Sequence, residues 1–238
     1  MNIDLIELPV SFRVIGVGHG IEEVINTIKS FGFDRVSAEV VKYPFDCTPN
    51  DDDKLAIIVF TDCDDNANSI AKRFHEAGVL TIGFSVDADA SCYDSVMQDI
   101  CATDLPRVIK ELLQPIVIPG IISYAFHDLY TTLHDSGSFI VKTTTGNNVT
   151  EAVEKLRTVI EGLDLECVEH LSVHLYFNPD RSIPVGMTDI VSLSELMSNL
   201  PETVNAIWSV NHDGKLNNED TKLSVILAGK EVGRCLKK

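Results

Sequence analysis

Short apolar runs and amphipathic stretches alternate along the first part of the chain. Leu55–Phe60 is apolar at every position, which is typical of a central parallel strand buried on both faces. Val24 and Ile28 lie four residues apart, the spacing of a helix that buries one face. Gly78 follows a second amphipathic stretch, at the position where a glycine often ends a helix. The pattern predicts strands at 12–17, 36–42, 55–60 and 79–85, joined by right-handed crossovers into a parallel sheet.

The second half of the chain alternates strands and helices again, after a stretch broken by prolines. Residues 91–113 have a mostly helical pattern, and Pro115 and Pro119 then interrupt it. We place the domain boundary in this stretch, which divides the chain into 1–118 and 119–238. The pattern beyond it predicts strands at 138–144, 171–177, 204–210 and 223–228, and helices at 126–134, 149–160 and 187–199.

Charge and cysteine spacing limit the partners and the compartment. The 238 residues carry 19 Lys and Arg against 36 Asp and Glu, a formal net charge of −17. Such a surface repels nucleic acid and anionic membranes, so we expect neither as a partner. The N-terminus does not resemble a secretory signal, and no apolar run reaches the roughly 18 residues of a membrane span. Six cysteines without paired spacing favour reduced thiols, and we expect a cytoplasmic protein.

A glycine-rich turn follows the first predicted strand. Gly16, Gly18 and Gly20 surround His19 just before the predicted helix that contains Glu22. A strand, a tight turn and a helix N-terminus together present backbone N–H groups to an anion. The acidic Glu22 in the first helical turn favours the helix dipole but opposes a bound phosphate. Two interpretations stay open: a working nucleotide loop, or a structural turn that binds no phosphate.

Acidic residues gather after the third predicted strand. Asp62, Asp64 and Asp65 lie in the segment TDCDDN, which directly follows the apolar run 55–60. The carboxyl ends of parallel strands meet at one edge of the sheet, the usual ligand crevice of such a fold. Carboxylate oxygens at that edge could hold Mg²⁺ or Ca²⁺. They could equally be solvated charges of a loop.

Two histidines lie four residues apart on a predicted strand. His170 and His174 would share one face of that strand, but about 13 Å would separate them. One metal ion cannot contact both side chains at that separation. We therefore predict structural roles for these histidines.

Four segments of the chain are similar to sequences of one family. The first two are FRVIGVGHGIEEVINTI at 12–28, which resembles IKVIGVGGGGGNAVNRM, and PGIISYAFHDLYTTLHDSG at 119–137, which resembles PGLINVDFADVRTVMSEMG. The others are LSVHLYFNPDRSIPVGMTDIVSLSELM and NAIWSVNHDGKLNNEDTKLSVILAGKE, which together resemble the family's second domain. The resemblance is to the tubulin/FtsZ superfamily, and specifically to a short bacterial FtsZ-like chain.

The resemblance implies both a fold and a nucleotide site. The fold is α/β: a shortened Rossmann-like domain of the FtsZ GTPase type in 1–118, followed by a smaller α+β domain of the FtsZ C-terminal type in 119–238. The family's nucleotide loops align with two segments of this chain. The residues that would contact GTP or GDP are Gly16, Gly18, His19, Gly20, Glu22, Thr61 and Asn66.

Two departures from the family pattern argue against GTP hydrolysis. The family's GGGTGTG loop is replaced by TDCDDN, Thr61–Asn66, whose aspartates offer acceptors where a phosphate needs donors. The resemblance also implies that a loop before a helix brings acidic residues to the neighbouring subunit's pocket. The first of these positions is Ala125, which has no carboxylate to orient water, and the second is Asp128. Asp128 is thus a catalytic remnant or a cap of its own helix.

Three functions are compatible with these residues. The first is a degenerate FtsZ-like protein that does not hydrolyse GTP and acts structurally, as a homo-oligomer or with an FtsZ-like partner, in a process such as cell division. The second is a GTP-binding, weakly hydrolysing protein that forms polymers with Mg²⁺. The third is a regulatory module that binds a metal or a small ligand through Asp62, Asp64 and Asp65.

Overall fold

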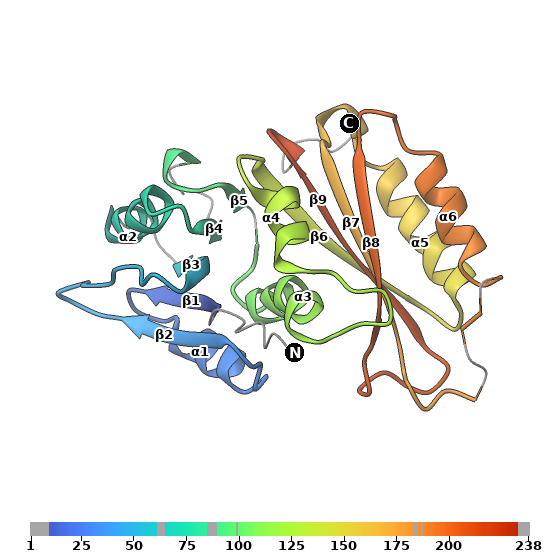
Figure 1. Ribbon diagram of the computed structural model, residues 1–238, viewed down its shortest axis with the longest axis horizontal. Helices are drawn as coiled ribbons and strands as arrows, with labels where there is room; N and C mark the ends of the chain where they lie inside the picture. The colour runs from blue at the N-terminus through green and yellow to red at the C-terminus, as the bar shows by residue number, and fades with distance from the viewer. Residues whose placement is uncertain are drawn as a thin grey trace, which may run out of the picture. The chain divides into compact units, whose positions relative to one another are not determined.

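The computed structural model describes residues 10–60, 65–84, 90–98, 100–182, 185–186 and 188–232. Contacts between Cα atoms divide the chain into two compact units, Met1–Pro106 and Arg107–Lys238. These are called unit 1 and unit 2 below (Figure 1). The boundary predicted at 118/119 differs from this division by residues 107–118, which form most of helix α3 (Leu105–Val117).

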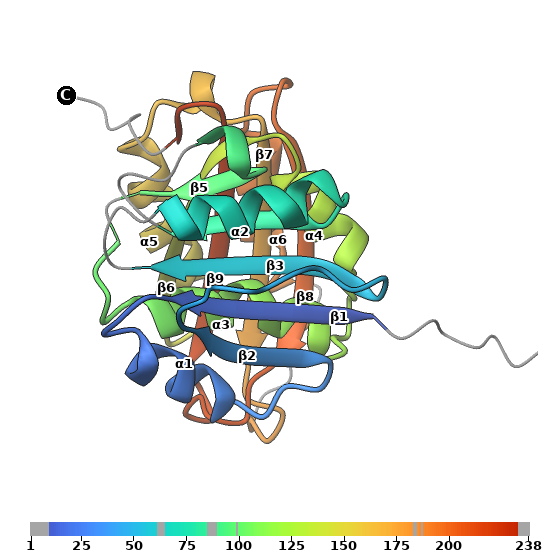
Figure 2. The same ribbon diagram turned by 90° about the vertical axis from the view of Figure 1, so that its left-hand side faces the viewer.

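Unit 1 contains a parallel sheet in the strand order β2-β1-β3-β4-β5. Figure 2 shows β2, β1 and β3 side by side in this order. The parallel α/β architecture predicted for the first half of the chain is confirmed. The elements are β1 (Ser11–Val17), α1 (Glu22–Lys29), β2 (Val36–Val41), β3 (Asp53–Phe60), α2 (Asp65–Glu76), β4 (Leu80–Phe84), the 3₁₀ turn Ala90–Cys92 and β5 (Ser95–Met97).

The register of unit 1 brings the carboxyl ends of its first three strands together. Val17, the last residue of β1, pairs with Val41 of β2 and with Phe60 of β3. The apolar run Leu55–Phe60 is buried throughout, as expected for a central strand. The glycine turn after β1 and the segment after β3 therefore start at the same edge of the sheet.

The prediction of a mostly helical segment at 91–113 is wrong in its first part. Ser95–Met97 forms β5, which pairs in parallel with β4, and α3 begins only at Leu105. Ser95 and Val96 are buried by this pairing, so the sheet outweighs the local helical pattern. At the other end, α3 continues through Pro115 to Val117.

Unit 2 contains a mixed sheet in the order β6-β9-β7-β8. Strand β9 is antiparallel to β6 and β7, whereas β7 and β8 are parallel. Figure 1 shows α5 and α6 over one face of this sheet and α3 and α4 on the other side. The remaining elements are α4 (Phe126–Leu133), β6 (Gly137–Gly146), α5 (Val149–Glu161), the 3₁₀ turn Leu165–Cys167, β7 (His170–Phe177), α6 (Val191–Ser198), β8 (Asn205–His212) and β9 (Thr221–Gly229).

The two faces of the unit 2 sheet bury different side chains. Leu171, Val173 and Leu175 alternate along β7 and pack with apolar residues of α5 and α6 in one core cluster. The opposite face carries a row of polar residues at matching register positions on four neighbouring strands. This row consists of Thr143, Ser224, His174 and Ser209. The alternation along β7 is thus apolar on one face and largely polar, yet still buried, on the other.

The helix lengths and the state of the cysteines test two further predictions. In the described ranges, every helix is too short or too polar to cross a bilayer. Cys47, Cys92 and Cys101 are free thiols, as the cysteine spacing predicts. Cys167 is disulfide-bonded, so the expectation of reduced thiols is wrong at that position.

Candidate functional site

The glycine turn after β1 has a backbone conformation that depends on its glycines. Gly18 and Gly20 have positive φ angles of 91° and 78°, which residues with a Cβ rarely adopt. A methyl group on Gly16 would lie 2.7 Å from Ile25 Cγ1, so this glycine lets α1 pack directly on the strand. Ile21 precedes α1 and provides no side-chain cap for the helix. The turn therefore directs the first backbone N–H groups of α1 toward the strand-end edge.

A carboxylate of the same helix already contacts these amides. The backbone N–H of Glu22, an ion pair with Lys42 and the N–H of Gly20 together lower the pKa of the Glu22 carboxyl. The Glu22 Oε1 to Lys42 Nζ distance is 3.1 Å. The carboxylate thus accepts hydrogen bonds from N–H groups that an anionic ligand would use. His19 lies on the exposed surface of the same turn.

The acidic segment after β3 is described only at its end. Asp65 and Asn66 open α2, and both are exposed. Thr61, Asp62 and Asp64 lie outside the described residues. Because β1 and β3 end in register, Asp65 and Asn66 follow the same edge as the glycine turn. Metal binding by this segment stays a prediction.

The predicted catalytic remnant lies at the start of α4 in unit 2. Ala125 is the N-cap residue of α4 and carries no polar side chain. The Asp128 Oδ2 atom accepts a hydrogen bond from the Ala125 backbone N–H at 2.7 Å. This is the reciprocal half of a capping box, in which the third helical residue bonds back to the N-cap amide. The structure thus gives Asp128 the capping role that was one of its two predicted roles.

Solved structures of known proteins match nearly the whole chain. An empty FtsZ dimer of M. jannaschii matches with a TM-score of 0.71 and 14% identity, over 93% of this chain and 89% of that one. TubZ of Bacillus thuringiensis serovar israelensis, solved as GDP-form protofilaments, matches with a TM-score of 0.62 and 10% identity, over 93% and 86%. The chain has the tubulin/FtsZ fold. No protein-family model and no curated protein matches the sequence.

Within this tubulin/FtsZ fold, a buried tyrosine fixes the loop that leads into α4. The Tyr124 hydroxyl lies 2.9 Å from Ser172 Oγ on β7 and 3.2 Å from Thr132 Oγ1 on α4. Its ring packs edge-on against the His174 ring, with 4.5 Å between the two ring centroids. Burial raises the pKa of Tyr124 to about 12, so the hydroxyl stays a neutral donor and acceptor. The sequence patterns did not predict this anchor, and its one visible signal is the polar alternation Ser172, His174 and Tyr176 along β7.

Apolar side chains of the same loop face outward. Ile118, Ile121 and Ile122 are exposed, and Ile121 retains 61% of its accessible surface. The backbone of this segment is held in place, because the Ile121 N–H donates to the Val210 carbonyl at 2.8 Å. An exposed apolar cluster on a fixed backbone is typical of a protein contact surface.

The two histidines considered as metal ligands both lie on β7, four residues apart. His174 is fully buried, and its Nδ1 lies 2.8 Å from Ser209 Oγ. Burial and the nearby Lys222 lower the pKa of His174 to about 3, so the ring is neutral. His170 lies at the first position of the strand, four residues away. The structure thus places His174 in the packing of unit 2.

Proposed function

We propose that this protein is a degenerate FtsZ-like structural protein that self-associates without hydrolysing GTP. The observation that carries the proposal is the start of α4. Ala125 offers only a methyl group, and the Asp128 carboxylate bonds to the N-cap amide of its own helix. Orienting an attacking water requires an acceptor that faces the nucleotide. An aspartate that caps its helix is poorly placed for that task.

The loop before α4 supports the self-association part of the proposal. Its exposed Ile118, Ile121 and Ile122 form an apolar surface of the kind that another copy of the chain could bury. The matched FtsZ structure is a dimer and the matched TubZ structure is a set of protofilaments. We infer that this chain assembles through its loop before α4. In this proposal the strand-end edge of the unit 1 sheet binds a nucleotide weakly or not at all.

Sedimentation of the purified chain tests self-association. We expect assembly that depends on protein concentration and needs no GTP. Ile121→Asp places a charge in the apolar surface and should reduce sedimentation at least tenfold. The matched control is Thr158→Asp, which adds the same charge at an exposed position of α5. Equal sedimentation of the two variants would contradict the proposed contact.

The glycine turn favours a second candidate, a protein that still binds a guanine nucleotide. Gly18 and Gly20 have positive φ angles in the turn before α1, which would let backbone N–H groups approach a phosphate, although Glu22 contacts the Gly20 and Glu22 amides. Ligand at about 100 times its dissociation constant would add about 2.7 kcal/mol to the unfolding free energy. A rise in melting temperature with GTP and Mg²⁺ would favour this candidate, and no shift at millimolar GTP would dismiss it.

A further inference from the structure

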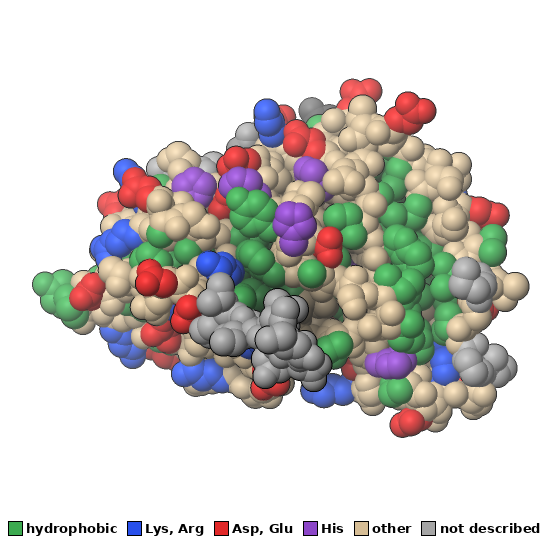
Figure 3. Space-filling view, viewed as in Figure 1, with side chains coloured by type: hydrophobic (Ala, Val, Ile, Leu, Met, Phe, Trp, Pro, Cys, Tyr) green, Lys and Arg blue, Asp and Glu red, His purple; other side chains and the backbone are tan. Residues whose placement is uncertain are grey.

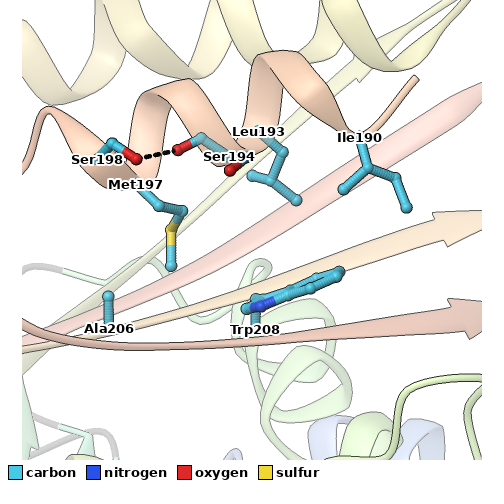
Figure 4. Close-up of a pocket in the computed structure, with 7 residues that line it drawn as sticks. All are labelled: Ile190, Leu193, Ser194, Met197, Ser198, Ala206 and Trp208. Atoms are coloured by element: carbon cyan, nitrogen blue, oxygen red, sulfur yellow. Dashed lines mark hydrogen bonds between the residues drawn. The ribbon is translucent and has the colours of Figure 1, made fainter. Parts of the chain in front are cut away.

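An apolar groove runs between α6 and the outer strand of unit 2. Leu193 and Met197 point from α6 toward Ala206 and Trp208 on β8, and Ile190 closes one end (Figure 4). The groove encloses about 330 Å³. Hydrophobic side chains form a continuous stripe over this region in the space-filling view (Figure 3). The groove therefore combines an apolar floor with access from solvent.

The strand that forms the floor of the groove has an open edge. Among the described residues, β8 is the outermost strand of unit 2. Val210 forms an antiparallel bridge with Ile122, with N to O distances of 3.1 Å and 3.2 Å in the two directions. Backbone groups two residues apart on a strand point to the same side. The N–H and C=O groups of Trp208 and Ala206 therefore point outward, along the edge that Ile122 already uses.

The chain segment 182–214, called the acidic ribbon below, contains α6 and β8 and carries a net negative charge. From Ser182 to Gly214 the sequence contains four acidic residues and no Lys or Arg. One of the four, Asp213, already pairs with Lys222 at 3.6 Å. Glu195 and Glu202 are exposed. The surface around the groove thus attracts cationic chains and repels acidic ones.

We infer that this groove binds an extended, cationic segment of another polypeptide by strand addition to β8. The incoming strand pairs with the outward backbone groups of Ala206 and Trp208, antiparallel, as Ile122 does. Every second side chain of the incoming strand is apolar and enters the groove, where it contacts Leu193 and Met197. Lysine or arginine side chains at the intervening positions face the acidic ribbon. This binding surface adjoins the loop before α4 but consists of β8 and α6 residues, and it goes beyond the proposed self-association.

The single tryptophan of the chain allows a direct test. The full-length chain is titrated with a seven-residue peptide that alternates lysine with valine and leucine, and Trp208 fluorescence is followed. We expect a saturable change in emission. A peptide with glutamate in place of lysine should bind at least tenfold more weakly. A lysine peptide with N-methyl groups on its pairing edge should not bind, because it cannot form the strand hydrogen bonds.

Two variants that each add one positive charge separate groove binding from general charge attraction. Met197→Lys introduces its charge into the groove and should weaken the lysine peptide at least tenfold. Thr158→Lys adds the same charge at an exposed position of α5, which does not line the groove, and should weaken it less than threefold. An equal or stronger effect of Thr158→Lys, equal binding of the N-methylated peptide, or no saturable signal would each overturn the inference. The N-methylated peptide keeps the test decisive even if Met197→Lys fails to fold.

Discussion

Unit 1 and unit 2 each build a sheet with helices, yet they place their polar side chains differently. In unit 1, Leu55–Phe60 fills the central strand with apolar side chains, and Glu22 and Asp65 lie in the solvent-accessible segments after the strands. In unit 2, one sheet face buries polar residues such as His174 and Ser209. Polar groups that are buried and mutually bonded stabilise architecture, whereas those at an open strand end can meet a ligand. We therefore expect ligand contacts at the accessible groups of unit 1, and structural roles for the buried polar groups of unit 2.

The buried charges of unit 2 should give the largest effect on stability. Lys222 Nζ lies 2.9 Å from Glu111 Oε1, and both side chains are at most 10% exposed. Lys222→Met leaves the Glu111 carboxylate without its partner, which should cost about 3–5 kcal/mol in unfolding free energy. Lys155→Met is the control, because Lys155 forms an exposed pair with Glu151 whose loss should cost at most about 0.5 kcal/mol. Similar losses in urea denaturation would contradict the distinction between buried and exposed polar groups.

The buried histidine should make unit 2 sensitive to acid. His174 stays neutral in the folded protein down to a pKa of about 3, whereas the unfolded chain takes up the proton near 6.5. The unfolded state therefore binds more protons below that pH, and stability falls as the pH falls. The loss should be about 1.4 kcal/mol per pH unit between these two values, with the full contribution present above pH 6.5. In His174→Gln the slope of stability against pH should be smaller by this amount, and an unchanged slope would argue against the buried neutral ring.

The cap of α4 should have a moderate effect. Asp128→Ala removes the hydrogen bond to the Ala125 N–H and a favourable charge in the first turn of the helix. Such a cap is worth about 1 kcal/mol. Thermal unfolding measures the loss. Asp128→Asn, which keeps a side-chain acceptor for the amide, should recover more than half of it. No loss in Asp128→Ala would mean that the carboxylate is not needed as a cap.

The exposed acid of unit 1 should affect ligand binding more than stability. Glu22→Gln removes the negative charge that contacts the Gly20 and Glu22 amides. We expect little change in melting temperature without ligand and a larger stabilisation by millimolar GDP than in the wild type. Glu23→Gln, in the same helical turn, is the matched control. Equal responses of the two variants would show that Glu22 does not compete with the nucleotide.

Local patterns predicted more of the fold than of the site. The run Leu55–Phe60 and the glycine turn could be recognised because each depends on neighbouring residues alone. The strand β5 was missed because its burial depends on pairing with β4, which a local window does not contain. The anchor between Tyr124 and Ser172 joins residues 48 positions apart, and the pair of Glu22 and Lys42 depends on the turn geometry.

The chain has the tubulin/FtsZ fold, and we propose that it self-associates without GTP hydrolysis. The most direct test is to measure phosphate released from GTP, in the presence of Mg²⁺, by the sedimented wild-type protein. We expect phosphate release at the rate of a blank without protein, and the same rate in Asp128→Ala. Phosphate release above the blank that disappears in Asp128→Ala would contradict it, because Asp128 would then act on the nucleotide as well as capping its helix.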